Sequence, residues 1–179
     1  MPLRKSKRRS RNEALLRYHN HRNQNLLAQP GKHQFAVVLD HLKAGFNVAK
    51  IFRSADVFSA QAVHLINIGP FDPAPAKGGF KRVPTRFHET FATCFEQLKT
   101  EGYTLFTLEA TSGVSLFDVH FPEKCAFIFG HEERGLSFNP ADHPEIERVS
   151  IPQFGQTESL NVSVAASIVM YEYTRQQQT

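Results

Sequence analysis

The sequence of 179 residues contains no tryptophan, only two cysteines, and no apolar run near the ~18 residues of a membrane-spanning helix. The two cysteines, Cys94 and Cys125, are too few for a disulfide framework and indicate no metal site. No apolar segment follows the basic N-terminus, which disfavours a secretory signal peptide but does not exclude a mitochondrial transit peptide, since those are also Arg-rich and poor in acids. We therefore expect a protein of the reducing cytoplasm, with neither a membrane segment nor a bound metal.

Acidic residues are scarce at the N-terminal end. Residues 1–34 contain nine of the 21 Lys/Arg residues and a single acid, Glu13, whereas the rest of the chain is mildly acidic. A detachable basic arm of this kind is typical of a protein that binds a polyanion, and nucleic acid is the expected one. A disordered solubilising tail explains the charge equally well. The apolar pair Leu26–Leu27 is expected to dock the end of the arm on the body.

Short apolar runs alternate with longer amphipathic stretches after the arm. The runs lack polar alternation, which predicts strands buried on both faces, as in a parallel sheet: 35–40, 62–67, 103–109, 124–129 and 148–151. Helices are expected between them, with a short turn near 114–118: about 46–59, 88–101 and 159–175. The pattern predicts an α/β domain of residues 35–179 after a basic arm of residues 1–34, with a mostly parallel sheet flanked by helices. The Pro/Gly-rich loop 69–79 is long enough to move or to contact a ligand.

The stretch "GFNVAKIFRSADVF" is an amphipathic helix by its spacing. Its apolar positions share one face, so Arg53 points roughly opposite to the core. An exposed pair of Arg53 with Asp56 is the simplest explanation of that charge, and Asn47 has the character of a helix N-cap.

The segment "FIFGHEERGLS" follows a strand directly. Ligands of open α/β sheets bind beyond the carboxyl ends of strands, and glycine there allows close approach of the backbone. Gly130, Glu132 and Gly135 form a G-x-E-x-x-G pattern, which is neither a Walker A loop nor a Rossmann fingerprint. A surface turn with solvated charges is the simpler explanation of this pattern alone.

The stretch "IPQFGQTESLNVSVAASIVMYEY" places six polar side chains between Pro152 and the apolar helix that follows. Ser159 or Asn161 is suited to cap that helix, but one cap does not explain six polar residues. Small residues at 163 and 165–167 predict close packing of the helix against a neighbour or a second subunit.

Taken together, these three segments resemble the SpoU-type RNA ribose methyltransferases of the SPOUT, or α/β-knot, superfamily. "NVAKIFRSAD", "FGHEERGLS" and "IPQFGQTESLNVSVA" match the three motifs of that family in its order, and the resemblance covers about residues 35–175. Three positions depart from the family pattern. Ala49 and Ser59 stand where glycine is usual, and His131 stands where asparagine is frequent.

The resemblance implies a C-terminal trefoil knot that wraps S-adenosylmethionine through backbone groups at Gly130, Ile151 and Leu160. It also implies a homodimer in which each active site borrows from the partner. The polar cluster then separates cofactor from RNA, and the helix with small residues joins the dimer interface.

The reaction implied is transfer of the sulfonium methyl group to a ribose 2′-hydroxyl, without a metal. Arg53 would grip phosphate and stabilise the developing alkoxide, since a guanidinium stays protonated in proteins and is a poor base. Asn47 and Glu132 would orient Arg53, while Ser159 and Asn161 would hold the ribose.

RNA contacts are expected from Arg53 and from basic residues of the arm and body: Arg4, Lys5, Lys7, Arg8, Arg9, Arg11, Lys81 and Arg82, with Lys77 and Arg86 next. The short arm favours tRNA over rRNA as substrate. Two alternatives are a non-catalytic RNA-binding protein that retains the knot fold and a small-molecule α/β enzyme.

Overall fold

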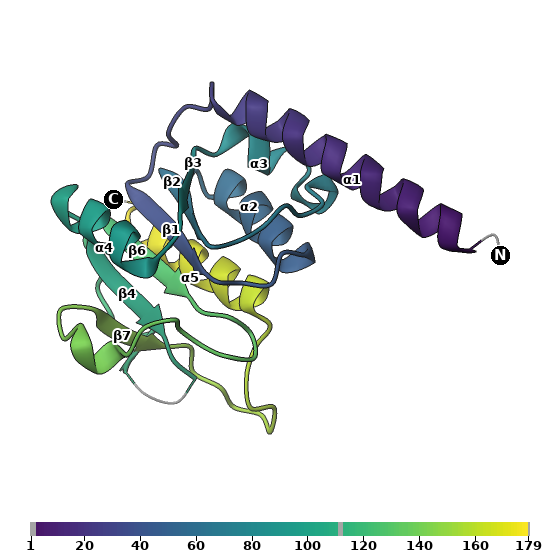
Figure 1. Cartoon of the computed structure of the whole chain (residues 1–179). Helices are drawn as coiled ribbons and strands as arrows, with labels where there is room; N and C mark the ends of the chain where they lie inside the picture. Colours follow the sequence, from purple (N-terminus) through teal and green to yellow (C-terminus); the bar gives the residue numbers. More distant parts are fainter. Residues whose placement is uncertain (1–2, 111–112, 179) are drawn as a thin grey trace.

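A parallel sheet of seven strands forms the centre of the computed structural model (Figure 1). The structure describes residues 3–110 and 113–178, with side chains described from residue 9 onward. Neighbouring strands all run parallel, in the order β3-β2-β1-β6-β4-β7-β5. The strands are β1 Phe35–Asp40, β2 Ala62–Ile66, β3 Thr85–His88, β4 Thr104–Leu108, β5 Val114–Ser115, β6 Cys125–Phe129 and β7 Glu147–Ser150.

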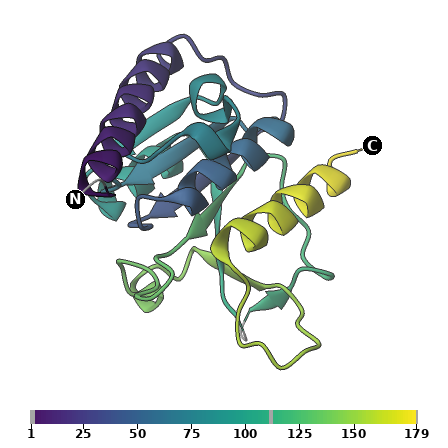
Figure 2. The same cartoon turned by 90° about the vertical axis from the view of Figure 1, so that its right-hand side faces the viewer.

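Helices cover both faces of this sheet, which confirms the predicted fold class (Figures 1 and 2). The helices are α1 Leu3–Asn25, α2 Phe46–Val57, α3 Gly79–Arg82, α4 Phe91–Thr100 and α5 Val162–Gln176, with single 3₁₀ turns at Ala74–Ala76 and Pro140–Asp142. One core contains residues of α1, α2, α3 and α5, and the other contains residues of α4. Among the described residues, no helix has the length and apolar character needed to cross a membrane.

Strand β1 shows why the sheet is apolar on both sides. Phe35, Val37 and Leu39 point into the core beneath α2 and α5, while Ala36 and Val38 point toward α4. All six of its residues are buried, as expected for a central parallel strand.

Two strands were not predicted. The edge strand β3 has the sequence Thr-Arg-Phe-His and is largely exposed, so it has no apolar run to mark it. Strand β5 has only two residues and lies where a turn was expected. The last helix begins at Val162 rather than near 159, because residues 151–161 form an irregular segment.

The loop 69–79 is anchored in the core, which differs from the expected mobile or ligand-contacting loop. Phe71 and Ala76 are buried, and the Phe71 ring contacts the rings of Phe52 and Phe80. Its residues are not among those that line the cavity described below.

The C-terminal half of the basic arm is docked on the body, which differs from the expected detachable arm. Tyr18 of α1 is 2% exposed and stacks on Phe80 of α3 with ring centroids 5.4 Å apart. At the end of α1, the buried Asn25 amide donates to two backbone carbonyls, of Phe80 and Val83, over 2.6 Å each. These groups hold the helix through its C-terminal half.

Leu26 and Leu27, by contrast, are 83% and 82% exposed. The expected docking of this apolar pair is therefore wrong. The arm is instead held by Tyr18 and Asn25 of α1.

Candidate functional site

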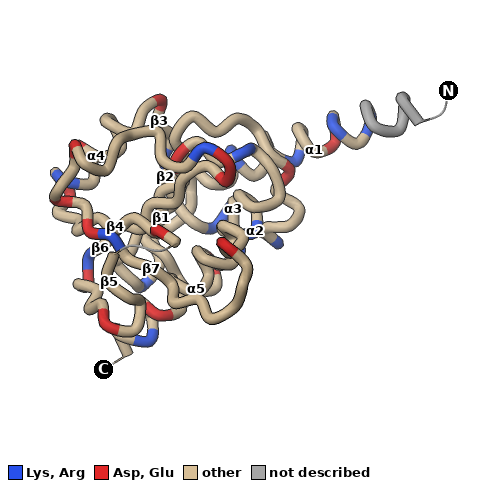
Figure 3. The backbone as a smooth tube through the Cα atoms, turned by 90° about the horizontal axis from the view of Figure 1, so that it is seen from below, with Lys and Arg blue, Asp and Glu red and all other residues tan. Residues whose placement is uncertain are grey.

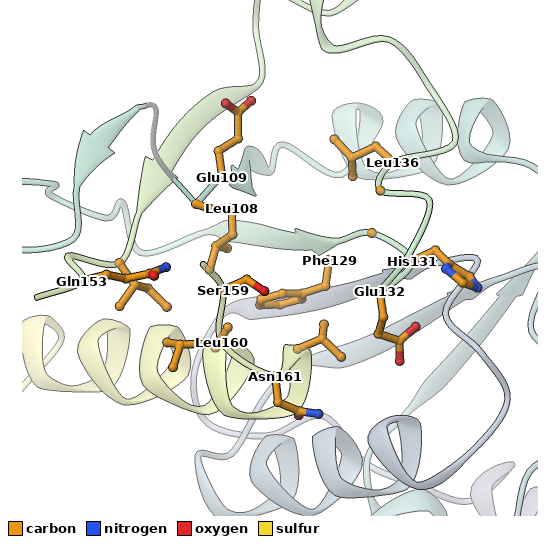
Figure 4. Close-up of a pocket in the computed structure, with 16 residues that line it drawn as sticks. Leu108, Glu109, Phe129, His131, Glu132, Leu136, Gln153, Ser159, Leu160 and Asn161 are labelled. Carbon is orange, nitrogen blue, oxygen red and sulfur yellow. The ribbon is translucent and has the colours of Figure 1, made fainter. Parts of the chain in front are cut away.

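A cavity of about 520 Å³ opens where three parallel strands end (Figure 4). Leu108 ends β4, Phe129 ends β6, and Ile151 follows β7; all three residues line the cavity. Since β6, β4 and β7 are adjacent in the sheet, their carboxyl ends meet at one edge. This is the position at which open α/β sheets bind ligands.

The loop after β6 forms one wall of the cavity. A Cβ atom on Gly130 would lie 2.6 Å from the carbonyl carbon of Gly135, so the two backbones approach too closely for any side chain. Gly135 has φ 71°, a left-handed conformation that favours glycine. His131 and Gly135 exchange two backbone hydrogen bonds of 2.8 Å. The G-x-E-x-x-G pattern therefore encodes a tight, specific loop.

Asp40 fastens this loop to the sheet. Its carboxylate is fully buried at the end of β1 and accepts hydrogen bonds from the backbone N–H and the hydroxyl of Ser137, over 2.6 and 2.8 Å. The same carboxylate lies 2.7 Å from Nδ1 of His41. Asp40 thus links the end of the central strand to the wall of the cavity.

Three polar side chains from distant parts of the sequence meet at the cavity. The Asn47 amide donates to Oε1 of Glu132 over 2.8 Å, and the Asn161 amide donates to Oδ1 of Asn47 over 3.2 Å. Glu132 and Asn161 line the cavity itself. We call Asn47, Glu132 and Asn161 the polar triad.

The contacts of Asn47 exclude its expected role as a helix cap. Gly45 precedes α2 as the capping residue, and Asn47 is the second residue of the helix. Its side chain is directed to Glu132 and Asn161 instead of to the backbone of its own helix.

Glu132 is held as a carboxylate. Partial burial opposes ionisation, but hydrogen bonds from the Asn47 amide, the backbone N–H of Glu132 and that of Lys43 keep the pKa of Glu132 below its usual range. A carboxylate with a depressed pKa is a weak proton acceptor, and it is suited to hold a cation or a donor.

Asn161 has two functions at once. Its Oδ1 accepts from the backbone N–H of Ser163 over 2.9 Å and so caps α5, as one of the simple readings predicted. Its Nδ2 is left to donate to Asn47. Ser159 is exposed and lines the cavity beside Leu160 and Asn161 (Figure 4).

Arg53 lies apart from the polar triad within this chain. It is exposed on α2, six residues and so about 9 Å along the axis from Asn47. It is not among the residues that line the cavity. The expected Arg53–Asp56 pair is wrong, because Asp56 binds Arg82 through two contacts of 3.1 Å.

The residues expected to contact the cofactor all line the cavity: Gly130, Ile151 and Leu160. The sequence did not single out Leu108, Phe129 and Leu136, which supply apolar lining, or Gln153 at the opposite side from the triad (Figure 4). Phe129 could have been found, since it is the last residue of the predicted strand 124–129, and Leu108 is the last but one of the predicted strand 103–109.

Two departures from the family pattern have a structural account. Ser59 has φ 57°, which explains the usual glycine there, and its hydroxyl accepts from the backbone N–H of Lys32 over 2.9 Å. The Nδ1 of His131 accepts from the backbone N–H of Glu133 over 3.0 Å and so braces the cavity loop. Ala49 is fully buried in the core.

The basic residues expected to bind RNA lie mainly on α1 and α3. Figure 3 shows α1 extending away from the body toward the N-terminus. Arg9 and Arg11 are exposed on it, whereas the side chains of four predicted residues lie outside the described ones: Arg4, Lys5, Lys7 and Arg8. Lys81 is half-buried on α3, and Arg82 is paired with Asp56.

The chain matches the sequence model of a family described as the SpoU rRNA Methylase family over residues 34–171. A tRNA (guanosine(18)-2'-O)-methyltransferase of Thermus thermophilus is 29% identical over 146 residues, which cover 78% of this chain and 74% of the relative. An uncharacterized tRNA/rRNA methyltransferase of Synechocystis is 28% identical over 153 residues, covering 83% of this chain and 56% of the relative. The chain thus spans little more than half of the Synechocystis protein.

Solved structures share the fold over most of this chain. The SpoU methyltransferase AviRb from Streptomyces viridochromogenes, in complex with the cofactor AdoMet, has a TM-score of 0.74 at 25% identity, covering 85% of this chain and 61% of that one. A structure that concerns the 2-OH methylation of C/U34 on tRNA has a TM-score of 0.70 at 29% identity, covering 82% of this chain and 98% of that one.

Proposed function

Because the chain belongs to the SpoU rRNA Methylase family, we propose that it transfers a methyl group from S-adenosylmethionine to the 2′-hydroxyl of a ribose in RNA. The resemblance inferred from three sequence motifs is thereby confirmed at the level of the family. One observation carries the proposal: residues of all three motifs meet as the polar triad at a cavity beyond the sheet. This arrangement favours an enzyme over a non-catalytic RNA-binding protein.

The cavity fits the cofactor in size and in its lining. Its volume of about 520 Å³ lies within the range of small-molecule sites, roughly 300–1,000 Å³. Leu108, Phe129 and Leu136 offer apolar surface, while the irregular backbone at Gly130, Ile151 and Leu160 offers peptide groups to an adenine. We assign these last three residues to cofactor binding. We also propose that the C-terminal part of the chain forms the trefoil knot that the family resemblance implies.

When bound, S-adenosylmethionine supplies an electrophilic methyl group on a positively charged sulfonium. Ser159 and Asn161 are placed at the cavity to hold the ribose, so that positioning supplies much of the acceleration. Glu132 is held as a carboxylate by its hydrogen-bond donors, and we assign it to hold a donor group in place. The proton passes to water or to an RNA phosphate.

We assign stabilisation of the developing alkoxide to Arg53, as a fixed positive charge beside the reacting oxygen. Arg53 does not line the cavity of its own chain, so we place it at the cavity of a second copy. Glu132 is then suited to hold the guanidinium of the partner's Arg53.

A homodimer is consistent with the outer surface of α5 and α2. Val164 and Tyr171 lie two turns apart on α5 and are 46% and 59% exposed, and Val57 of α2 is 69% exposed. The small residues of α5 pack in part against α2 of the same chain, where the hydroxyls of Ser54 and Ser167 lie 2.7 Å apart. The exposed apolar side chains remain available to the second copy.

We favour tRNA as the substrate. Both the Thermus relative and the structure that this chain covers to 98% are described by their action on tRNA. The docked α1 offers a basic helix that projects beyond the body to capture the RNA backbone (Figure 1).

Methyl transfer tests the proposal directly. The protein is incubated with S-adenosylmethionine labelled in its methyl group and with tRNA or rRNA, and the RNA is digested to nucleosides. We expect label in a 2′-O-methylnucleoside. Label on a base would overturn the assignment to ribose, and cofactor binding without any transfer would favour the non-catalytic alternative.

A further inference from the structure

Three potential metal ligands meet on the α4 side of the sheet, away from the cavity. They are His64 of β2, His88 at the end of β3, and Cys94 of α4. Their ligand atoms all lie within 4.8 Å of one another. No metal site was expected here, because the spacing of these residues matches no common metal-binding motif.

The distances between these atoms approach the edges of a tetrahedral zinc site. Nδ1 of His64 lies 2.9 Å from Nε2 of His88 and 3.7 Å from Sγ of Cys94. Zinc bonds to nitrogen and sulfur at tetrahedral angles place two such nitrogens about 3.3 Å apart and nitrogen and sulfur about 3.6 Å apart. The two ring nitrogens face each other, with the ring planes 6° apart, so both imidazoles must turn toward the ion for all three atoms to bind it.

The surroundings of the cluster favour metal binding. Cys94 is fully buried in the core beneath α4, and His64 is 2% exposed at the border of that core. Each histidine turns one ring nitrogen toward the cluster, and a neutral imidazole nitrogen is a common zinc ligand. Cys94 binds an ion as the thiolate, so an incoming ion must displace the thiol proton, as zinc does in thiolate sites.

We propose that His64, His88 and Cys94 form a zinc site, with water as the fourth ligand. Two imidazoles and a thiolate suit Zn²⁺ better than Mg²⁺ or Ca²⁺, which prefer oxygen. Partly exposed His88 gives the ion its path of entry. The ion would fasten the edge strand β3 and helix α4 to β2, so its role is structural, and it is separate from methyl transfer.

Cobalt titration tests this site through its thiolate ligand. Full-length protein freed of metal with EDTA is titrated with Co²⁺ and then with Zn²⁺. We expect a single equivalent of Co²⁺ to produce a thiolate-to-cobalt charge-transfer band and tetrahedral visible bands, which Zn²⁺ abolishes. Zinc at a hundredfold excess over its Kd should raise the unfolding midpoint by about 5–10 °C.

Cys94→Ser should lose the charge-transfer band, whereas Cys125→Ser, which changes the other buried cysteine, should keep it. If Cys94→Ser does not fold, His88→Gln at the partly exposed ligand decides, with loss of tetrahedral binding expected. The proposal is overturned if the wild-type protein gives no such band, or if the band survives in Cys94→Ser or the tetrahedral spectrum survives in His88→Gln.

Discussion

The Asn47 amide donates to Oε1 of Glu132 over 2.8 Å and joins the first turn of α2 to the loop after β6. The two residues are 85 positions apart in the sequence. Asn47 also accepts from Asn161, so it is the central member of the polar triad. Its removal would take one hydrogen-bond partner from each neighbour at the place where the ribose is expected to bind.

We predict that Asn47→Ala reduces kcat for methyl transfer about 100-fold, because Glu132 and Asn161 lose their fixed orientation. Cofactor affinity should change little, since Asn47 does not line the cavity. The control is Glu133→Gln, which neutralises an exposed carboxylate in the same loop and should retain activity. Equal losses in both variants would show that the loop, and not the triad, is responsible.

Arg53→Ala should abolish methyl transfer while the protein stays folded, because the side chain is exposed. Its action in trans can be tested by mixing it with Asn47→Ala. A mixed dimer then has one site with both residues intact, and random exchange should restore about a quarter of wild-type activity. If the mixture stays inactive although the subunits exchange, Arg53 acts within its own chain.

Tyr18→Ala should destabilise the protein by about 3 kcal/mol, as expected for loss of a buried aromatic ring. The ring is 2% exposed and contacts Phe71 and Phe80. Leu16→Ala changes a neighbouring residue that is 63% exposed and should shift the unfolding free energy by no more than about 0.5 kcal/mol. Urea unfolding measures both; similar values would mean that α1 is not docked in solution.

Deletion of residues 2–12 removes the projecting part of α1 and leaves Tyr18 and Asn25 in place. If about four of its basic residues contact phosphates, the deletion should reduce the slope of log K for RNA binding against log salt concentration by about three in magnitude. Cofactor affinity should stay unchanged, which checks the fold. Identical slopes for the two proteins would assign RNA capture to the body, with Lys77, Lys81 and Arg86 the next residues to change.

The central sheet could be predicted because buried parallel strands are continuous apolar runs, as in β1 and β6. The edge strand β3 could not, since its pairing depends on β2 and on Asn25 of α1, whose Oδ1 accepts from the N–H of Thr85. Docking of α1 was missed for a similar reason. Its basic charge suggested a free arm, while a few residues such as Tyr18 fix it to the body.

The site was predictable in membership but not in geometry. The motifs supplied Asn47, Glu132 and Asn161, yet local spacing made Asn47 a helix cap, and only the folded chain brings it to Glu132. The His64–His88–Cys94 cluster has no sequence signal at all, because three separate elements contribute one residue each.

The central claim is methylation of a ribose in RNA by the polar triad, and a map of 2′-O-methylation over tRNA and rRNA tests it most directly. Unmodified RNA is treated with S-adenosylmethionine and either the wild-type protein or Asn47→Ala. We predict a new 2′-O-methyl group at a defined nucleotide, in tRNA, with the wild-type protein and its near absence with the variant. No new 2′-O-methyl group in either RNA, from folded protein that binds the cofactor, would contradict the account.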